Sequence, residues 1–115
     1  MEWLSKYRTE LALPVVALAE IAFGIERIRP QERANRLEQR YNEWTRAYAG
    51  AIYLFNFDCA AAYAALMANA EGLGRPMAMP DGMIAAIALV NGGRLATRNI
   101  RDFETTGLEL ISPWD

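Results

Sequence analysis

The sequence predicts an α/β domain in which helices cover a central parallel sheet. Short apolar stretches that read as strands are separated by longer helical segments, which is the order expected of βα units. The chain has 115 residues, enough for one domain. Its composition, 53% hydrophobic and 23% charged, is that of a globular protein rather than a disordered chain. We therefore expect a single domain over residues 1–115.

In the first half of the chain, the spacing of apolar residues predicts one strand and three helical segments. The strand is the apolar stretch over residues 11–16, in which Pro14 counts against a central place in the sheet. Pro30 and Gly50 end two of the helices, because a helix usually stops before proline and glycine favours the position after the last turn. The predicted helical segments are a short turn over residues 2–8 and helices over residues 17–28 and 31–48.

In the second half, three predicted strands are joined by two helices and by loops. Residues 52–57 are β-branched or aromatic for the most part, which favours a strand, and Asp58 is a plausible N-cap for the helix that follows. Pro-Asp-Gly at residues 80–82 is typical of a helix start, and Gly92-Gly93 of a helix end. The remaining predicted elements are helices over residues 59–71 and 82–91, strands over 94–97 and 108–111, and a loop over 102–107.

The residue counts exclude several kinds of site. The chain has no histidine, which removes a histidine base, a histidine nucleophile and every histidine-containing metal site. Its one cysteine, Cys59, excludes a disulfide framework and a thiolate zinc site, and it fits a reducing cytoplasm. No apolar run reaches the roughly 18 residues of a membrane helix. The formal net charge of −2 means that nucleic acid, if bound, must be held by a local patch or through a metal.

Three carboxylates fall just past predicted strands or at a helix entrance, where ligands gather in parallel sheets. The first, Glu20, interrupts the apolar run VVALAEIAFGI. A charge in such surroundings is costly unless it is paired or binds a metal. The alternatives are a partly exposed helix position or an ion pair with Arg27 or Arg29.

The other two carboxylates, Asp81 and Asp102, also have structural alternatives to metal binding. Asp81 stands in Pro-Asp-Gly before an apolar helix, so it could be an N-cap, a metal ligand or both. Asp102 lies in TRNIRDF, where the alternatives to a metal ligand are a loop cap or an ion pair with Arg98 or Arg101.

Taken together, four segments of the chain resemble the PIN-domain toxins of the VapC and FitB type. The resemblance runs from about Val15 to Trp114, and the order and spacing of its motifs are specific. The segments are LAEIAFGIERI before the charged helix, FNFDCAAAYAAL, GRPMAMPDGMIAAIALVNGG and LATRNIRDFETTGLELISPW.

The resemblance implies a three-layer α/β/α domain with a central parallel sheet, and a metal-dependent endoribonuclease that is the toxin of a toxin–antitoxin pair. It implies carboxylates that bind Mg²⁺ or Mn²⁺. Such an ion activates a water molecule and stabilises the charged transition state, so no histidine is required. The resemblance also implies an RNA substrate, which we expect to be single-stranded or looped so that its backbone fits a crevice. The matching positions are Glu20, Asp81 and Asp102 as catalytic metal ligands, and Thr97, Arg98 and Asn99 at the substrate.

One segment typical of the family is missing from the start of this sequence. Relatives begin with a strand and a turn that reads like LDTN, whose Asp is a principal metal ligand. This chain starts near the helix that follows that strand, at EWLSKYRTE, so the expectation is a PIN-like domain without its first strand. This leaves a second hypothesis, a catalytically impaired domain that binds an antitoxin or dimerises. A third is a structural domain whose acids are caps and ion pairs.

We expect two protein partners and a cytoplasmic location. One partner is a cognate antitoxin, which by the family resemblance would place a basic side chain among the acidic residues. The other is a second copy of the chain, because an apolar stripe at helical spacing needs cover from the core or from a partner. The stripe consists of Leu37, Tyr41, Trp44 and Tyr48.

Overall fold

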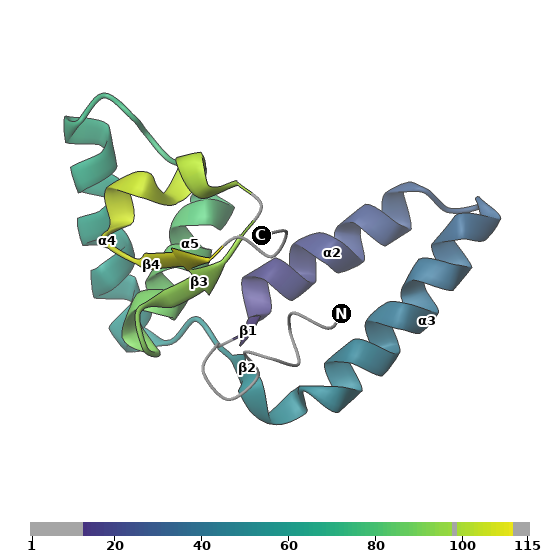
Figure 1. Cartoon of the computed structure of the whole chain (residues 1–115). Helices are drawn as coiled ribbons and strands as arrows, with labels where there is room; N and C mark the ends of the chain where they lie inside the picture. Colours follow the sequence, from purple (N-terminus) through teal and green to yellow (C-terminus); the bar gives the residue numbers. More distant parts are fainter. Residues whose placement is uncertain (1–12, 98, 112–115) are drawn as a thin grey trace.

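A computed structural model of the chain describes residues 13–97 and 99–111. It is a mostly helical α/β fold with parallel strand pairing, as the sequence predicts (Figure 1). The predicted turn over residues 2–8 lies outside the described residues. The elements are β1 (Leu13–Pro14), α2 (Val15–Arg27), α3 (Glu32–Ala47), the 3-10 helix η1 (Ala49–Ala51), β2 (Ile52–Tyr53), α4 (Phe57–Gly72), α5 (Met79–Val90), β3 (Arg94–Ala96), the 3-10 helix η2 (Ile100–Thr106) and β4 (Glu109–Ile111).

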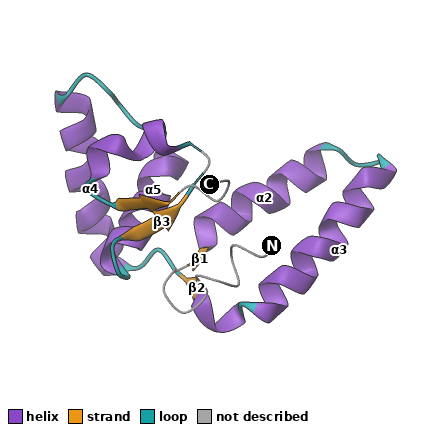
Figure 2. Cartoon of the chain, in the orientation of Figure 1, coloured by secondary structure: helices purple, strands orange, loops and turns teal. Residues whose placement is uncertain are grey.

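The described strands form two parallel pairs. β1 pairs with β2, with Leu13 opposite Ile52, and β3 pairs with β4, with Arg94 opposite Glu109. Both β1 and β3 lie against α5, so one helix covers parts of both pairs. Over the described ranges no ladder joins the two pairs, which stand as separate short ladders among the helices (Figure 2).

Two predicted strands end earlier along the chain than expected. The strand predicted over residues 11–16 ends at Pro14, and α2 begins at Val15. The strand predicted over 52–57 ends at Tyr53, because its partner β1 ends at Pro14 and the chain enters α2 at Val15. The chain beyond β2 turns into α4, which begins at Phe57.

The start of α4 corrects the predicted cap. Asn56, rather than Asp58, is the N-cap: its Oδ1 accepts a hydrogen bond from the Cys59 backbone N–H at 3.1 Å. Asp58 lies inside the first turn. Asparagine and aspartate cap about equally well, so the register of the helix decided between them. A further correction concerns residues 102–107, predicted as a loop, most of which belong to η2.

The core is built around α5. The residues from Ile84 to Ala88 are all buried, and they pack with Cys59, Leu66 and Phe103. Gly82 lets α4 approach closely, because a Cβ at this position would overlap the Sδ of Met67. The same packing fixes the start of α5, which carries Asp81.

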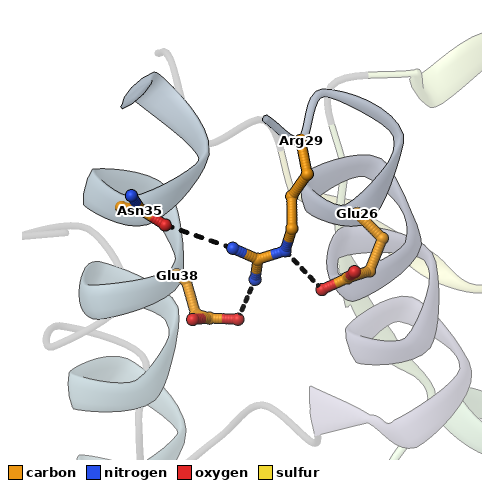
Figure 3. Close-up of polar contacts among 4 residues, drawn as sticks. All are labelled: Glu26, Arg29, Asn35 and Glu38. Atoms are coloured by element: carbon orange, nitrogen blue, oxygen red, sulfur yellow. Dashed lines mark hydrogen bonds and ion pairs between the residues drawn. The ribbon is translucent and has the colours of Figure 1, made fainter. Parts of the chain in front are cut away.

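Helices α2 and α3 form a hairpin that projects from the block made by α4, α5, β3 and β4 (Figure 1). Arg29 joins the two helices at the tip of the hairpin (Figure 3). Its Nε donates to Glu26 Oε1 at 2.8 Å, its Nη1 to Asn35 Oδ1 at 3.2 Å, and its Nη2 to the Glu38 carboxylate. Among the described helices, none combines the length and apolar character needed to cross a membrane.

Candidate active site

Asp81 lies in the first turn of α5. The helix begins at Met79 after Ala78, which makes no side-chain cap, and Pro80 occupies the first turn. Asp81 is therefore not the N-cap, and the capping alternative for this residue is wrong. A helix start favours a negative charge through its unpaired N–H groups and the helix dipole, so this position in α5 suits a carboxylate.

Asp102 lies in η2, which follows β3 along the chain. Its backbone N–H donates to the Asn99 carbonyl at 3.0 Å, and the next residue, Phe103, is buried in the core. Because α5 runs into β3 through a short turn, the start of α5 and the segment after β3 lie at the same edge of the fold. The two aspartates line one open cavity of about 310 Å³.

Asp102 affects the protonation of Asp81. Burial raises the pKa of Asp81 above its ordinary value of 3.8, and the charge of Asp102 raises this pKa further. A like charge nearby disfavours ionisation of both groups together. The pair is therefore a place where a cation would relieve repulsion.

The same cavity holds two arginines and a threonine that the sequence analysis did not single out as site residues. Arg75 and Arg101 line it, and Thr105 contributes a buried Oγ1 that has no hydrogen-bond partner in the part of the chain described. Guanidinium groups match phosphate oxygens with parallel hydrogen bonds. The signal that could have found Arg75 is its position in Gly-Arg-Pro between two apolar helices, a polar group where the chain must turn.

Glu20 is exposed on α2 and does not line this cavity. Its apolar neighbours Ile21 and Phe23 are also exposed, at 40% and 64%, whereas Leu18 and Ile25 of the same run are buried, so Glu20 lies on the exposed side of an amphipathic helix. The ion pairs expected for it are not observed within the described residues. Arg29 pairs with Glu26 and Glu38, and Arg27 lies over the Phe23 ring at 5.6 Å.

The predicted substrate residues follow the end of β3. The Thr97 Oγ1 accepts a hydrogen bond from the Asn99 backbone N–H at 3.0 Å, and the Thr97 N–H donates to the Ile111 carbonyl. These bonds fix the turn that leads into η2. Neither Thr97 nor Asn99 lines the cavity, and Arg98 lies outside the described residues.

The donor set fits a hydrated divalent ion of the Mg²⁺ type. Such an ion is usually held by one or two carboxylates, keeps several waters and takes further oxygens from substrate phosphates. Asp81 and Asp102 supply two carboxylates at one cavity. Within residues 13–97 and 99–111, histidine, cysteine, aspartate and glutamate form no cluster of three that could hold a metal, so the predicted convergence of Glu20 with this pair is not observed.

Comparison with known proteins shows which family the chain resembles. Residues 1–107 match the family model described as "PIN domain". The VapC ribonuclease Y4jK of Sinorhizobium fredii is 34% identical over 117 residues, covering 100% of this chain and 84% of that protein. Toxin FitB of Neisseria gonorrhoeae is 29% identical over 114 residues, covering 97% of this chain and 82% of that protein. The crystal structure of FitAcB from Neisseria gonorrhoeae superposes with a TM-score of 0.84 at 28% identity, over 98% of this chain and 83% of that chain.

Proposed function

The chain belongs to the PIN domain family, and on that basis we propose that it is a metal-dependent endoribonuclease, the toxin of a toxin–antitoxin pair. The observation that carries the proposal is the cavity shared by Asp81, Asp102, Arg75 and Arg101. It combines two carboxylates that can hold a cation with the exposed Arg101 guanidinium, which can bind a phosphate. A bound cation and a guanidinium both stabilise the negative charge that develops in phosphodiester hydrolysis.

Asp81 and Asp102 are the proposed ligands of Mg²⁺ or Mn²⁺, and Glu20, which is exposed on α2 outside the cavity lining, is not included in this proposed set. When bound, the ion would supply an activated water and stabilise the charge that develops on the phosphate. The role of the aspartates is to stay ionised and to hold two oxygens at a fixed separation. Arg101 is exposed at the rim of the same cavity, where its guanidinium can receive a phosphate of the incoming strand.

RNA is the proposed substrate, with the turn after β3 as its second contact. Thr97, Arg98 and Asn99 are the residues proposed to meet the strand there. A chain of net charge −2 attracts RNA poorly as a whole. The electrostatic attraction must therefore come from Arg98, Arg101 and the bound metal. Single-stranded or looped RNA suits an open cavity because its backbone is free to bend into it.

A cognate antitoxin is the proposed regulator, and the cytoplasm the proposed location. Relatives carry the names VapC ribonuclease and Toxin FitB, which supports the toxin half of such a pair. A basic side chain of the antitoxin placed between Asp81 and Asp102 would relieve their repulsion and displace the metal. We also propose a homodimer, whose interface would include the stripe on α3.

The test of the proposed activity compares Asp81→Asn with Asp58→Asn. Both aspartates lie in the first turn of a helix, but Asp58 is exposed on α4 and does not line the cavity. Mn²⁺ affinity and cleavage of a labelled single-stranded RNA should each fall by at least about tenfold in Asp81→Asn, a loss of ~1.4 kcal/mol. Asp58→Asn should match the unmodified chain in both measurements.

The second candidate function is a catalytically impaired domain that binds an antitoxin or dimerises. It is favoured by the cavity, which has only two carboxylates among the described residues. Metal binding without RNA cleavage, lost in Asp81→Asn, would support this candidate over the nuclease. Equal Mn²⁺ affinity in the two variants and the unmodified chain would rule out the metal site itself.

A further inference from the structure

The 3-10 helix η2, which carries Asp102, is longer than such helices usually are. It runs for seven residues, whereas the strained hydrogen bonds of a 3-10 helix rarely support more than three or four. Its conformation therefore depends on contacts with the rest of the fold. Phe103 and Thr106 anchor it on the core side, where both are buried.

On its outer side, η2 is tied to α4 and to the loop after it by two side chains. Asn69 Nδ2 donates to the Thr105 carbonyl at 3.2 Å. Arg75 makes a double contact: its Nη2 donates to the Arg101 carbonyl at 2.7 Å and its Nη1 to Glu104 Oε2 at 3.0 Å. The Arg101 carbonyl belongs to the residue directly before Asp102, so this contact of Arg75 holds the backbone next to that carboxylate.

Arg75 is itself held at its base. Its backbone N–H donates to the Ala70 carbonyl at 2.9 Å, at the end of α4. The preceding residue, Gly74, has φ = 72°, a left-handed conformation that directs the chain out of the helix. The Arg75 side chain therefore extends from a fixed point on α4 to the backbone of η2, while the same loop leads into α5 and Asp81.

We propose that Arg75 is a positioning residue whose guanidinium fastens η2 to the end of α4 and so sets the separation between the Asp81 and Asp102 carboxylates. This inference rests on the proposed function, because the separation matters through the metal that the two carboxylates would share. A metal site works only when its ligands are held within about 0.5 Å of the required geometry. Folding itself depends little on the Arg75–Glu104 pair, since exposed ion pairs contribute about 0–1 kcal/mol.

The direction in which Arg75 variants change metal affinity distinguishes a positioning role from an effect of the arginine charge alone. Arg75 lines the cavity as a cation, so its charge repels a divalent ion, and removing that charge alone would strengthen metal binding. Loss of positioning would weaken metal binding instead. Lysine at this position keeps the charge but lacks the planar fork that reaches both the Arg101 carbonyl and Glu104.

The experiment measures three quantities in five variants of the full chain: Mn²⁺ affinity without RNA, the KM for a labelled single-stranded RNA, and the melting temperature. Arg75→Ala and Arg75→Lys should each weaken Mn²⁺ binding about three- to tenfold, with the melting temperature nearly unchanged. Asn69→Ala, which removes the other tie without changing any charge, should weaken it in the same direction by a smaller factor. Arg94→Ala removes an arginine that pairs with Glu109 across β3 and β4, outside the cavity lining, and should leave Mn²⁺ affinity unchanged.

The fifth variant, Asp81→Asn, separates this inference from the proposed function. If Asp81→Asn loses Mn²⁺ and the two Arg75 variants bind it as tightly as the unmodified chain, or more tightly, the positioning role is overturned and the metal site stands. A raised KM for RNA with unchanged Mn²⁺ affinity in Arg75→Lys would also overturn it, in favour of direct phosphate contact. If the unmodified chain does not bind Mn²⁺, the proposed function fails first and this inference with it.

Discussion

Opposing electrostatic effects act on the pKa of Asp81. The helix start favours its ionised form, whereas burial and the neighbouring Asp102 disfavour it, and the net result is a raised pKa. The folded state therefore holds its proton to higher pH than the unfolded chain. Stability from this group is highest at low pH and is lost as pH rises through the ordinary pKa of 3.8 and then the raised one.

This balance predicts the pH dependence of Asp81→Asn in the absence of divalent metal. The melting temperature of the variant minus that of the unmodified chain should increase between about pH 3 and pH 7, because only the unmodified chain loses the contribution of the Asp81 carboxyl group over this range. The increase should be a few degrees at most, since interactions of partly exposed charges are worth under about 1 kcal/mol. Thermal unfolding followed by circular dichroism measures it. A difference that shrinks as pH rises would contradict the raised pKa.

Two helical glycines, Gly82 and Gly24, allow a comparison of a closely packed position with an open one. At Gly82 a Cβ would overlap Met67 Sδ and lie 3.0 Å from Tyr63 Cε2, in a ring that also packs edge-on against Phe55. At Gly24, in α2, nothing lies within 4 Å of the position that a Cβ would occupy. The two sites therefore differ in available space, although both lie in helices.

Alanine should consequently have opposite effects at these two positions. Gly24→Ala should stabilise the fold by about 0.5–1 kcal/mol, the ordinary gain of alanine over glycine in a helix. Gly82→Ala should destabilise it by about 1 kcal/mol, because crowding of about 1–3 kcal/mol exceeds that gain. Urea unfolding of both variants gives the comparison. Stabilisation of similar size at both positions would show that α4 does not pack closely on α5.

At the scale of elements, the sequence located the helices well and the strands less well. The helices predicted over 17–28, 31–48, 59–71 and 82–91 are all present, because apolar spacing and Pro or Gly boundaries act over a few neighbouring residues. Strand length instead depends on a partner that is distant in sequence. Leu54 and Phe57 have strand-like side chains, yet β1 offers them no partner, and both are exposed.

The α2–α3 hairpin gives a prediction at this scale. Arg29 links Glu26 on one helix with Asn35 and Glu38 on the other, so Arg29→Ala should loosen the tip without disturbing the block around α5 (Figure 3). Native-state hydrogen exchange should accelerate for amides near residues 25–38 and remain unchanged in α5. Arg33→Ala, at an exposed arginine of α3 that forms no ion pair with any other described residue, is the control. Equal exchange at the tip in both variants would contradict the linking role.

At the scale of the whole molecule, the hairpin leaves apolar side chains uncovered. The stripe on α3 is partly covered: Leu37 is 37% exposed, and Tyr41, Trp44 and Tyr48 are half-buried. On the facing helix, Phe23 is 64% exposed. Apolar surface on a projecting element is typical of a protein–protein interface.

We therefore predict a dimer in solution that depends on this hairpin. Sedimentation at tens of micromolar, about the range in which a modest interface forms, should show a dimer for the unmodified chain. Leu37→Glu should shift it toward monomer by placing a charge in the interface. Leu73→Glu, at an exposed leucine beyond the end of α4, should leave the dimer intact. Monomer alone for the unmodified chain, or equal dimer in both variants, would exclude this interface.

Some residues of the candidate site could be predicted from the sequence, and others are identified only by the tertiary structure. The sequence by itself singled out Asp81 and Asp102, because acids beside helix starts and strand ends are visible in local patterns. It did not indicate that Arg75 and Arg101 share their cavity, since these residues meet only when the loop after α4 packs on η2. It also led to an expectation of costly burial for Glu20, although α2 exposes that face.

The sequence therefore determined the fold class, the helices and two acidic positions of this protein. The tertiary structure decided the strand lengths, the N-cap of α4, and which charged groups face one another. The physical reason is the range of the forces involved. Helix propensity, capping and turn preferences operate within a few residues of the chain. Strand pairing, burial and charge interactions depend on groups brought together from distant parts of it, such as Asp81 in α5 and Asp102 in η2.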